Sequence, residues 1–329
     1  MSLRIIKPGI LDTVQDGGRH GYRHLGINPG GAMDVFSAGL ANALLGKEGG
    51  AAVIEMHFPT PHIVFEAPTI ICMSGADFSP ELDNIPIPLN QPVIINKNTL
   101  LTFTKRVWGA CCYLAILHTF SLEKWLHSYS THLKAKAGGF EGRALQKGDV
   151  IPFVEHYDFS NLLGEKPFCV LPWKVPVPER KRSVIQFIKG AEWDWLTEEA
   201  KALFGKELFT MAPQSDKMGY RLQGKPLKTS TKEQLVSTPV AFGTVQLLPN
   251  GQTILLMADH QTTGGYPKIA QVASVHLPLL AQMQTGATFS FLEVDLQTAE
   301  RELWRQEHYL QQVRSASQFK IEKLLHANL

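Results

Sequence analysis

Residues 284–291, Gln284-Thr285-Gly286-Ala287-Thr288-Phe289-Ser290-Phe291, place a tight turn directly before a strand in which apolar and polar residues alternate. Residues 96–103 and 146–153 share this design. A turn followed by period-two alternation is typical of an entry into a hairpin strand. Three such entries predict closed or nearly closed β-barrels. They are weak evidence for a true internal repeat, because hairpin chemistry alone produces such patterns.

The rest of the chain reads as short strands with few helices. Further strands are predicted at residues 63–65, 69–73, 93–95, 113–117, 184–188, 244–248 and 253–257. Apolar residues at helical spacing predict helices at residues 33–45, which end at Gly46, and at residues 192–204. Ser121 can cap a short helix over residues 121–125, and residues 295–326 predict a charged helix with a thin apolar face. The fold class is therefore mainly β with peripheral helices.

Length and composition favour an ordinary globular protein. The chain has 329 residues, of which 44% are hydrophobic and 19% charged, so it can bury a large core. The net charge of +2 is spread without a basic block, which argues against a nucleic-acid or membrane-surface partner. The Pro-rich residues 171–178 are the best candidate linker. They predict an N-terminal lobe over residues 1–170 and a C-terminal lobe over residues 171–329, and the two lobes can be intertwined.

The expected compartment follows from the termini and the cysteines. Residues 1–9 contain no long apolar stretch, and no segment approaches 18 uncharged apolar residues. The four cysteines lie in apolar runs without CxxC spacing: Cys72, Cys111, Cys112 and Cys169. We therefore expect a cytoplasmic protein with buried reduced thiols and no metal site.

Four polar, glycine-rich segments stand where a β-barrel needs only a turn. In the first, residues 12–22, two glycines separate Asp16 from Arg19, so backbone amides can approach a ligand that a carboxylate and a guanidinium flank. The alternative is a turn with a local Asp16–Arg19 ion pair. The second, residues 30–34, leads into a helix whose first amide groups can attract an anion. Its Asp34 either stabilises the helix dipole or points to the same pocket.

The third segment, residues 73–77, ends a strand in a turn of small residues that carries one acid, Asp77, a turn former or a site carboxylate. The fourth, residues 257–268, is the most unusual. It holds an acid, an imidazole, an amide, two hydroxyls, two glycines, a phenol and an amine. Such density is what a preorganised polar site requires. The sequence has no Walker P-loop, HExxH or GxSxG motif. The four segments are predicted to face one cleft.

These segments resemble the KipA family, also called the allophanate-hydrolase-subunit-2 or biotin-dependent carboxyltransferase-like family. The segments that match the family pattern keep their order along the chain: residues 13–22, 31–34, 41–42, 74–77, 130–132, 138–143, 148–149, 217–222, 256–259 and 261–268. Three positions depart from the family's pattern. His118-Thr119 replaces Gly-Gly, Lys217 replaces Arg and Lys47 replaces Asn, which puts the local pocket shape and any bidentate contact in question.

The resemblance implies cyclophilin-like β-barrel lobes in a protein that works with two partner subunits, one of KipI type and one of LamB/YcsF type. That complex opens the lactam of 5-oxoproline to glutamate at the expense of ATP, with Mg²⁺ as the counter-ion of ATP. Two alternatives remain open. One is a biotin-dependent carboxyltransferase of urea or another small amide, although the sequence has no AMKM-type biotinyl-lysine motif. The other is a regulatory protein that binds a KipI-type partner.

Within this resemblance the polar segments receive expected roles. Asp259 or Asp77 would act as base on, or acceptor from, the amide N–H. Lys268 and Arg19 would hold a carboxylate or a phosphate. The remaining expected substrate-binding residues are Gln15, Asp34, Gln261, Thr262, Thr263, Gly264, Gly265 and Tyr266. The isolated chain is expected to be inactive.

Overall fold

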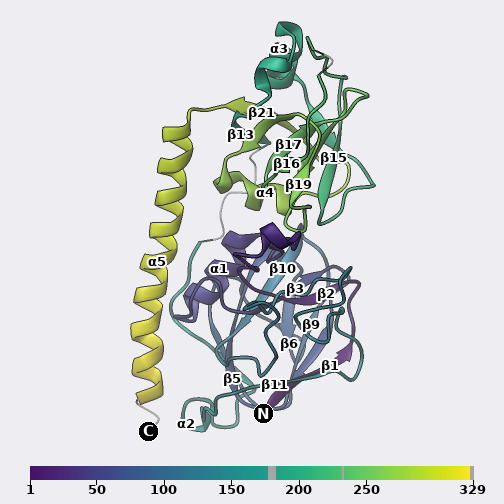
Figure 1. The fold of residues 1–329 in the computed structure, drawn as a ribbon. Coiled ribbons are helices and arrows are strands. Elements are labelled where there is room, and N and C mark those ends of the chain that lie inside the picture. Colours follow the sequence, from purple (N-terminus) through teal and green to yellow (C-terminus); the bar gives the residue numbers. More distant parts are fainter. Residues whose placement is uncertain (177–182, 232, 327–329) are drawn as a thin grey trace. The chain divides into compact units, whose positions relative to one another are not determined.

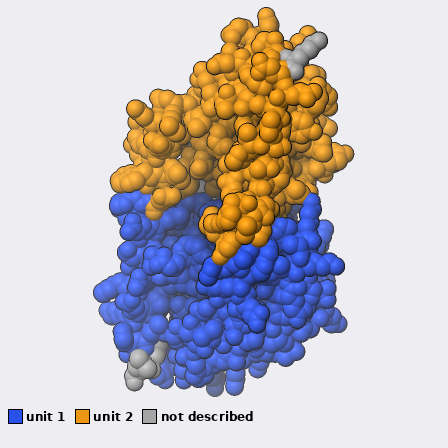
Figure 2. Space-filling view, in the orientation of Figure 1, with its two compact units in different colours: residues 1–19, 34–178, 308–329 blue, residues 20–33, 179–307 orange. Residues whose placement is uncertain are grey.

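A computed structural model of the chain describes residues 1–176, 183–231 and 233–326. The chain forms two compact units, and each unit contains more than one segment (Figure 2). Unit 1 comprises residues 1–19, 34–178 and 308–329, and unit 2 comprises residues 20–33 and 179–307. The predicted division into lobes at residue 170 stays a prediction. Val177 and Pro178 of the predicted linker lie outside the described residues.

Unit 1 is built from two six-stranded sheets. Figure 1 labels several of their strands, among them β1, β5 and β10. The first sheet has the order β11-β1-β4-β9-β6-β7, and the second has the order β12-β8-β5-β10-β3-β2. The strands are β1 (Ser2–Lys7), β2 (Asp12–Gln15), β3 (Val53–His57), β4 (His62–Phe65), β5 (Thr69–Asp77), β6 (Pro80–Leu82), β7 (Ile85–Pro86), β8 (Val93–Ile95), β9 (Thr99–Phe103), β10 (Trp108–Ile116), β11 (Val150–Pro152) and β12 (Phe168–Val170). Side chains of both sheets enter one apolar core, among them Leu3, Ile54 and Phe65. Mainly β structure is thereby confirmed for this half of the chain.

Helix α1 (Val35–Leu44) packs on β5 and β10. Its buried residues Leu40, Ala41 and Leu44 give it an apolar face, as the spacing predicts. The helix ends before Gly46, whose φ of +71° lies in the left-handed region that favours glycine. A Cβ atom at Gly46 would also stand 2.6 Å from the Cα atom of Gln318. Both the backbone conformation and this close approach therefore require glycine.

Unit 2 contains a closed seven-stranded barrel in the order β13-β20-β17-β18-β15-β14-β21. The strands are β13 (Val184–Lys189), β14 (Phe209–Met211), β15 (Gly219–Gln223), β17 (Thr244–Leu247), β18 (Thr253–Leu256), β20 (Lys268–Val272) and β21 (Thr288–Glu293), with a separate pair of β16 (Thr238–Pro239) and β19 (Thr263–Gly264). Phe204 stacks on Phe291 at 4.5 Å between ring centroids, and both lie in the apolar core. Closure leaves the barrel no open edge.

Two helical predictions were wrong in detail. Residues 121–125 form no helix, because the backbone of Trp125 pairs with Ser128 in a tight turn. Residues 192–204 divide into a 3-10 turn (Trp193–Trp195) and α3 (Glu198–Lys206), since the Thr197 hydroxyl caps α3 by accepting the N–H of Ala200 at 3.2 Å.

The remaining helices are α2 (Ser160–Leu163), α4 (Leu277–Ala281), two further 3-10 turns (Arg23–Leu25 and Ser274–His276) and the long α5 (Leu296–His326). The C-terminal half of α5 belongs to unit 1 and buries Ser317 and Ile321, while its Arg314 pairs with Glu48. No helix among the described residues is both long and apolar enough to span a membrane.

One buried acid in the core of unit 1 makes stability depend on pH. Asp12 on β2 is 1% exposed, and its Oδ2 accepts the N–H of Gly9 at 2.6 Å. Burial raises the pKa of Asp12 to about 7. The folded chain therefore holds this proton at pH values where the unfolded chain has lost it.

We therefore expect the free energy of unfolding to fall as pH rises from about 4 to about 7, because ionisation is disfavoured only in the folded state. The Asp12→Asn variant lacks this titration. Urea unfolding of both proteins across this range should show the wild-type value falling relative to that of the variant. Parallel curves would contradict the assignment.

Candidate functional site

The carboxylate of Asp16 gathers four donors in unit 1. Its Oδ1 accepts the hydroxyls of Ser128 and Ser130 at 2.7 and 2.6 Å and the N–H of Gly18 at 2.8 Å. Its Oδ2 accepts the N–H of Tyr129 at 2.6 Å. These contacts join the end of β2 to residues 128–130. The Asp16–Arg19 ion pair considered from the sequence is not among the contacts described for Asp16.

Arg19 and Gln15 belong to the same junction. The guanidinium of Arg19 is buried, donates from Nη2 to the carbonyl oxygen of Ser130, and lies 4.7 Å from the ring centroid of Trp125. The amide of Gln15 donates to the carbonyl oxygen of Thr131 at 3.4 Å. Both side chains hold one segment of unit 1 against another. Substrate contact by either one stays a prediction.

Asp34 is the N-cap of α1. Its carboxylate accepts the N–H and the hydroxyl of Ser37 at 2.8 and 2.6 Å. Its own N–H donates to the hydroxyl of Tyr113 at 2.7 Å, and that hydroxyl donates to Glu55 at 2.9 Å. Burial raises the pKa of Tyr113, so the phenol stays protonated and can make this donation. Asp34 therefore stands one residue before the helix, as its N-cap, rather than in the first turn as the sequence suggested, and its contact with a substrate stays a prediction.

Asp77 ends β5 and forms a turn. Its Oδ1 accepts the N–H of Ser79 at 3.0 Å, and its carbonyl oxygen accepts the N–H of Val107 at 2.8 Å. Ser79 has a φ of +52°, which the turn imposes. A role of Asp77 as a base stays a prediction.

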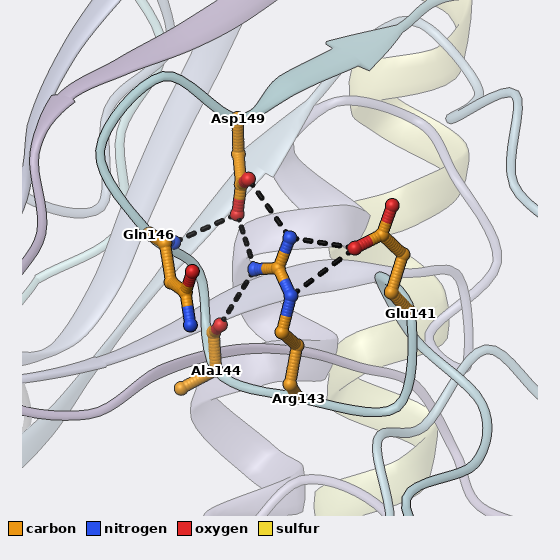
Figure 3. A network of polar contacts seen from close by, with 5 residues as sticks. All are labelled: Glu141, Arg143, Ala144, Gln146 and Asp149. Atoms are coloured by element: carbon orange, nitrogen blue, oxygen red, sulfur yellow. Dashed lines mark hydrogen bonds and ion pairs between the residues drawn. The ribbon is translucent and has the colours of Figure 1, made fainter.

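Arg143 lies at the centre of a second polar network of unit 1, drawn in Figure 3. Its Nη1 and Nη2 bind both carboxylate oxygens of Asp149 at 2.7 and 3.0 Å. Nε and Nη2 donate to Glu141 at 3.1 and 2.6 Å, and Nη1 also reaches the carbonyl oxygen of Ala144 at 3.1 Å. The bidentate guanidinium therefore closes the loop over residues 138–149. The sequence analysis identified residues 138–143 and 148–149 as family motifs but did not predict that Arg143 and Asp149 bind each other.

The departures from the family pattern that belong to unit 1 share one location. Lys47 donates from Nζ to the carbonyl oxygens of Ile116 and His118 at 2.5 and 3.0 Å. Thr119 donates its N–H and hydroxyl to Glu155 at 2.6 and 2.7 Å. Burial lowers the pKa of Lys47 to about 8 and that of His118 to about 4. Lys47, His118 and Thr119 thus belong to one hydrogen-bonded cluster at the end of β10.

In unit 2, Lys268 at the start of β20 lies beside a carboxylate that the sequence analysis missed. Its Nζ donates to the hydroxyl of Thr238 and lies 3.6 Å from Oε1 of Glu192. Its backbone N–H donates to Oε2 of Glu192 at 2.8 Å. Since the Lys268 and Glu192 side chains are 16% and 11% exposed, this cation is fixed rather than free in solvent.

Amide groups line the next part of the loop. Gln261 donates to the side-chain oxygen of Gln246 at 3.4 Å, and Gln246 donates to the carbonyl oxygen of Tyr266 at 3.5 Å. A Cβ atom at Gly264 would stand 2.4 Å from Nε2 of Gln246, so any larger residue here would displace the side-chain amide of Gln246. Gln246 is 2% exposed and was not predicted, because it lies on β17, outside the polar segment.

The other predicted residues of the loop lie close by in the chain. Thr263 and Gly264 pair with β16, and the carbonyl oxygen of Thr262 accepts the N–H of Val240 at 3.2 Å. A Cβ atom added at Gly265 would come into van der Waals contact with Ser237, and Tyr266 is 44% exposed.

The start of the loop is anchored by its backbone. The N–H of Asp259 donates to the carbonyl oxygen of Lys217 at 2.8 Å. The carbonyl oxygen of Asp259 accepts Nδ2 of Asn28 at 3.0 Å. Because Lys217 contributes its carbonyl here, the exchange of Arg for Lys leaves this contact intact. The next residue, His260, is 2% exposed.

The predicted site residues thus fall into two groups. Gln15, Arg19, Asp34 and Asp77 belong to unit 1, and the residues from Asp259 to Lys268 belong to unit 2. One cleft that contains both groups stays a prediction. Among the described residues, no group of His, Cys, Asp and Glu could hold a metal ion, and all four cysteines are free.

Two cavities of unit 2 lie away from the predicted residues. One of about 380 Å³ is lined by Arg221, Gln214, Gln223 and Asn250, among others. The other, of about 290 Å³, lies beside His276 and Arg305.

Comparison with known proteins gives one family. The sequence profile described as "Carboxyltransferase domain, subdomain A and B" matches residues 25–293. The 5-oxoprolinase C subunit of Haemophilus influenzae is 34% identical over 92% of this chain and 94% of its own length. The protein of the same name from Escherichia coli is 33% identical over 94% of this chain and 97% of its own length. The crystal structure of the Kluyveromyces lactis urea amidolyase matches with a TM-score of 0.85 and 24% identity, over 95% of this chain and 20% of that one.

The junction at Asp16 predicts a specific loss of stability. The Asp16→Ala variant leaves two hydroxyls and two N–H groups without their acceptor, so the free energy of unfolding should fall by about 3 kcal/mol. Asp16→Asn keeps one oxygen acceptor and should lose less. Urea unfolding measures both. As a control, Asp194→Ala removes a side chain that is 91% exposed and should change stability by about 0.5 kcal/mol or less. Equal effects of Asp16→Ala and Asp194→Ala would refute the structural role.

Proposed function

Since the chain belongs to the family of the carboxyltransferase domain with subdomains A and B, we propose that it is the C subunit of an ATP-dependent 5-oxoprolinase. The reaction opens the lactam of 5-oxo-L-proline to L-glutamate. The observation that carries this proposal is the match to two 5-oxoprolinase C subunits over more than nine-tenths of both chains.

The donors and acceptors in the polar loop of unit 2, residues 257–268, are suited to an amide substrate. A lactam carbonyl is a poor electrophile, and phosphorylation of its oxygen by ATP creates an imidate-like group that water can displace. Charge moves along the amide during this step, so fixed donors and acceptors around it lower the barrier. Gln261, Thr262 and Thr263 supply such groups within three consecutive residues.

Lys268 is the candidate to bind the anionic part of the same substrate. Its ammonium group is held by Thr238 and Glu192. A positioned cation of this kind can bind the carboxylate of 5-oxoproline or a phosphate. The proton acceptor for the amide N–H would come from the same loop, where Asp259 is the candidate that the sequence predicts.

The proposal includes partner subunits and a compartment. A KipI-type and a LamB/YcsF-type subunit would complete the enzyme in the cytoplasm, with ATP and Mg²⁺ bound at the level of the complex. The alternative, a biotin-dependent carboxyltransferase of urea, has weaker support. The urea amidolyase structure, at 24% identity, shows the same fold and no more.

The purified chain should therefore form no glutamate from 5-oxo-L-proline and ATP, because a complete catalytic set requires the partners. Addition of the KipI-type and LamB/YcsF-type subunits should produce glutamate and ADP in equal amounts, which coupled assays of both products measure. Turnover by the chain alone would contradict the subunit role. An assembled complex that instead consumes urea and carboxybiotin would favour the alternative.

A further inference from the structure

One hydrogen bond determines which ring nitrogen of His260 carries the proton. Its Nδ1 lies 2.6 Å from the carbonyl oxygen of Gln261. A carbonyl oxygen can only accept, so Nδ1 carries the hydrogen and Nε2 carries a lone pair. Burial, together with the nearby charge of Arg23, lowers the pKa of His260, so the ring is neutral near pH 7. His260 therefore presents an acceptor.

Within residues 20–33 of the same unit, two polar side-chain atoms lack a hydrogen-bond partner among the described residues. They are Oδ1 of Asn28 and Nη2 of Arg23, and both are buried. Asn28 is 8% exposed, and its other amide atom donates to the carbonyl oxygen of Asp259, next to His260. A buried polar atom without a partner is unfavourable, so a ligand that pairs it gains affinity.

The three groups complement one kind of ligand. Asn28 and His260 offer acceptors, and Arg23 offers a donor. An amide within a small ring holds its C=O and N–H on the same side of the C–N bond. Such an amide can accept from Arg23 and donate to Asn28 or His260 at once. A carboxylate or phosphate, which has no N–H, would leave both acceptors unpaired.

We propose that Arg23, Asn28 and His260 form the binding site for the amide of the lactam, with His260 as the acceptor of its proton. This assignment rests on the proposed function and refines it, since it replaces Asp259 in that role. The backbone contacts of Asp259 with Lys217 and Asn28 make it the anchor of the loop instead.

ATP is the phosphoryl donor in this step. The N–H proton of the lactam moves to Nε2 of His260 while the lactam oxygen bonds to the γ-phosphorus. The bond from that phosphorus to the β–γ bridging oxygen breaks, and its electrons leave with ADP. The product is the O-phosphorylated cyclic imidate, and Arg23 donates to the oxygen on which charge develops.

A matched pair of variants tests this role in the reconstituted complex. His260→Asn places an amide nitrogen where Nδ1 stands, so it keeps the bond to Gln261 and loses Nε2. His260→Gln keeps a polar atom near the place of Nε2 but cannot take up a proton. Both should lower kcat roughly 10²-fold, the scale of a positioned base. The melting temperature of His260→Asn should stay near that of wild type.

His276→Gln serves as the control, because this buried histidine lies beside the separate cavity of about 290 Å³. It should keep the wild-type kcat. An assembled His260→Asn complex with full activity, or a large loss confined to Asp259→Asn, would overturn the assignment. An inactive wild-type complex would instead count against the proposed function.

A second readout needs no turnover. In ¹⁵N NMR spectra of the histidine-labelled wild-type chain at pH 7, His260 should show a protonated Nδ1 and an unprotonated Nε2. Addition of 5-oxo-L-proline to the labelled complex should shift the Nε2 resonance toward that of a hydrogen-bonded acceptor. The opposite tautomer, or an Nε2 signal unchanged at saturating lactam, would overturn the proposal even if a variant failed to fold.

Discussion

The carboxylate of Asp16 is the constraint on which the described structure of unit 1 depends. Four donors, from Gly18 and from residues 128–130, converge on it and replace the water that this partly buried carboxylate loses on folding. Arg19 and Gln15 extend the same junction to residues 130–131, and Arg143 closes the loop that follows. Many of the polar residues that match the family pattern in this unit therefore stabilise the fold.

The polar loop of unit 2 is built on a different principle. The closed barrel pairs its own strands, so the connection from β18 to β20 is free to carry polar side chains. Those side chains are held by residues outside the loop: Glu192 and Thr238 fix Lys268, and Gln246 fixes Gln261. A site that is positioned by a rigid barrel needs little rearrangement when charge develops on the substrate, which is the property that makes such sites effective.

Periodicity predicted most strands and α1, because alternation and helical spacing are local properties. The short helix predicted at residues 121–125 is absent because Trp125 pairs with Ser128 in a local turn and its ring packs against Arg19, which is a tertiary contact. The density of polar residues identified the loop at residues 257–268. His260 stood in that loop without an assigned role, and Asn28, Glu192 and Gln246 lie in other segments, so only the folded chain shows what they face.

In the proposed enzyme, the loop of unit 2 binds the lactam, while the polar residues of unit 1 stabilise the fold. A crystal structure of the assembled complex with 5-oxo-L-proline tests this division of roles most directly. We expect the lactam N–H within hydrogen-bond distance of Nε2 of His260 and the lactam oxygen within hydrogen-bond distance of Nη2 of Arg23. Lactam bound only in the cavity lined by Arg221, or only against Asp77 with no contact to the loop, would contradict it.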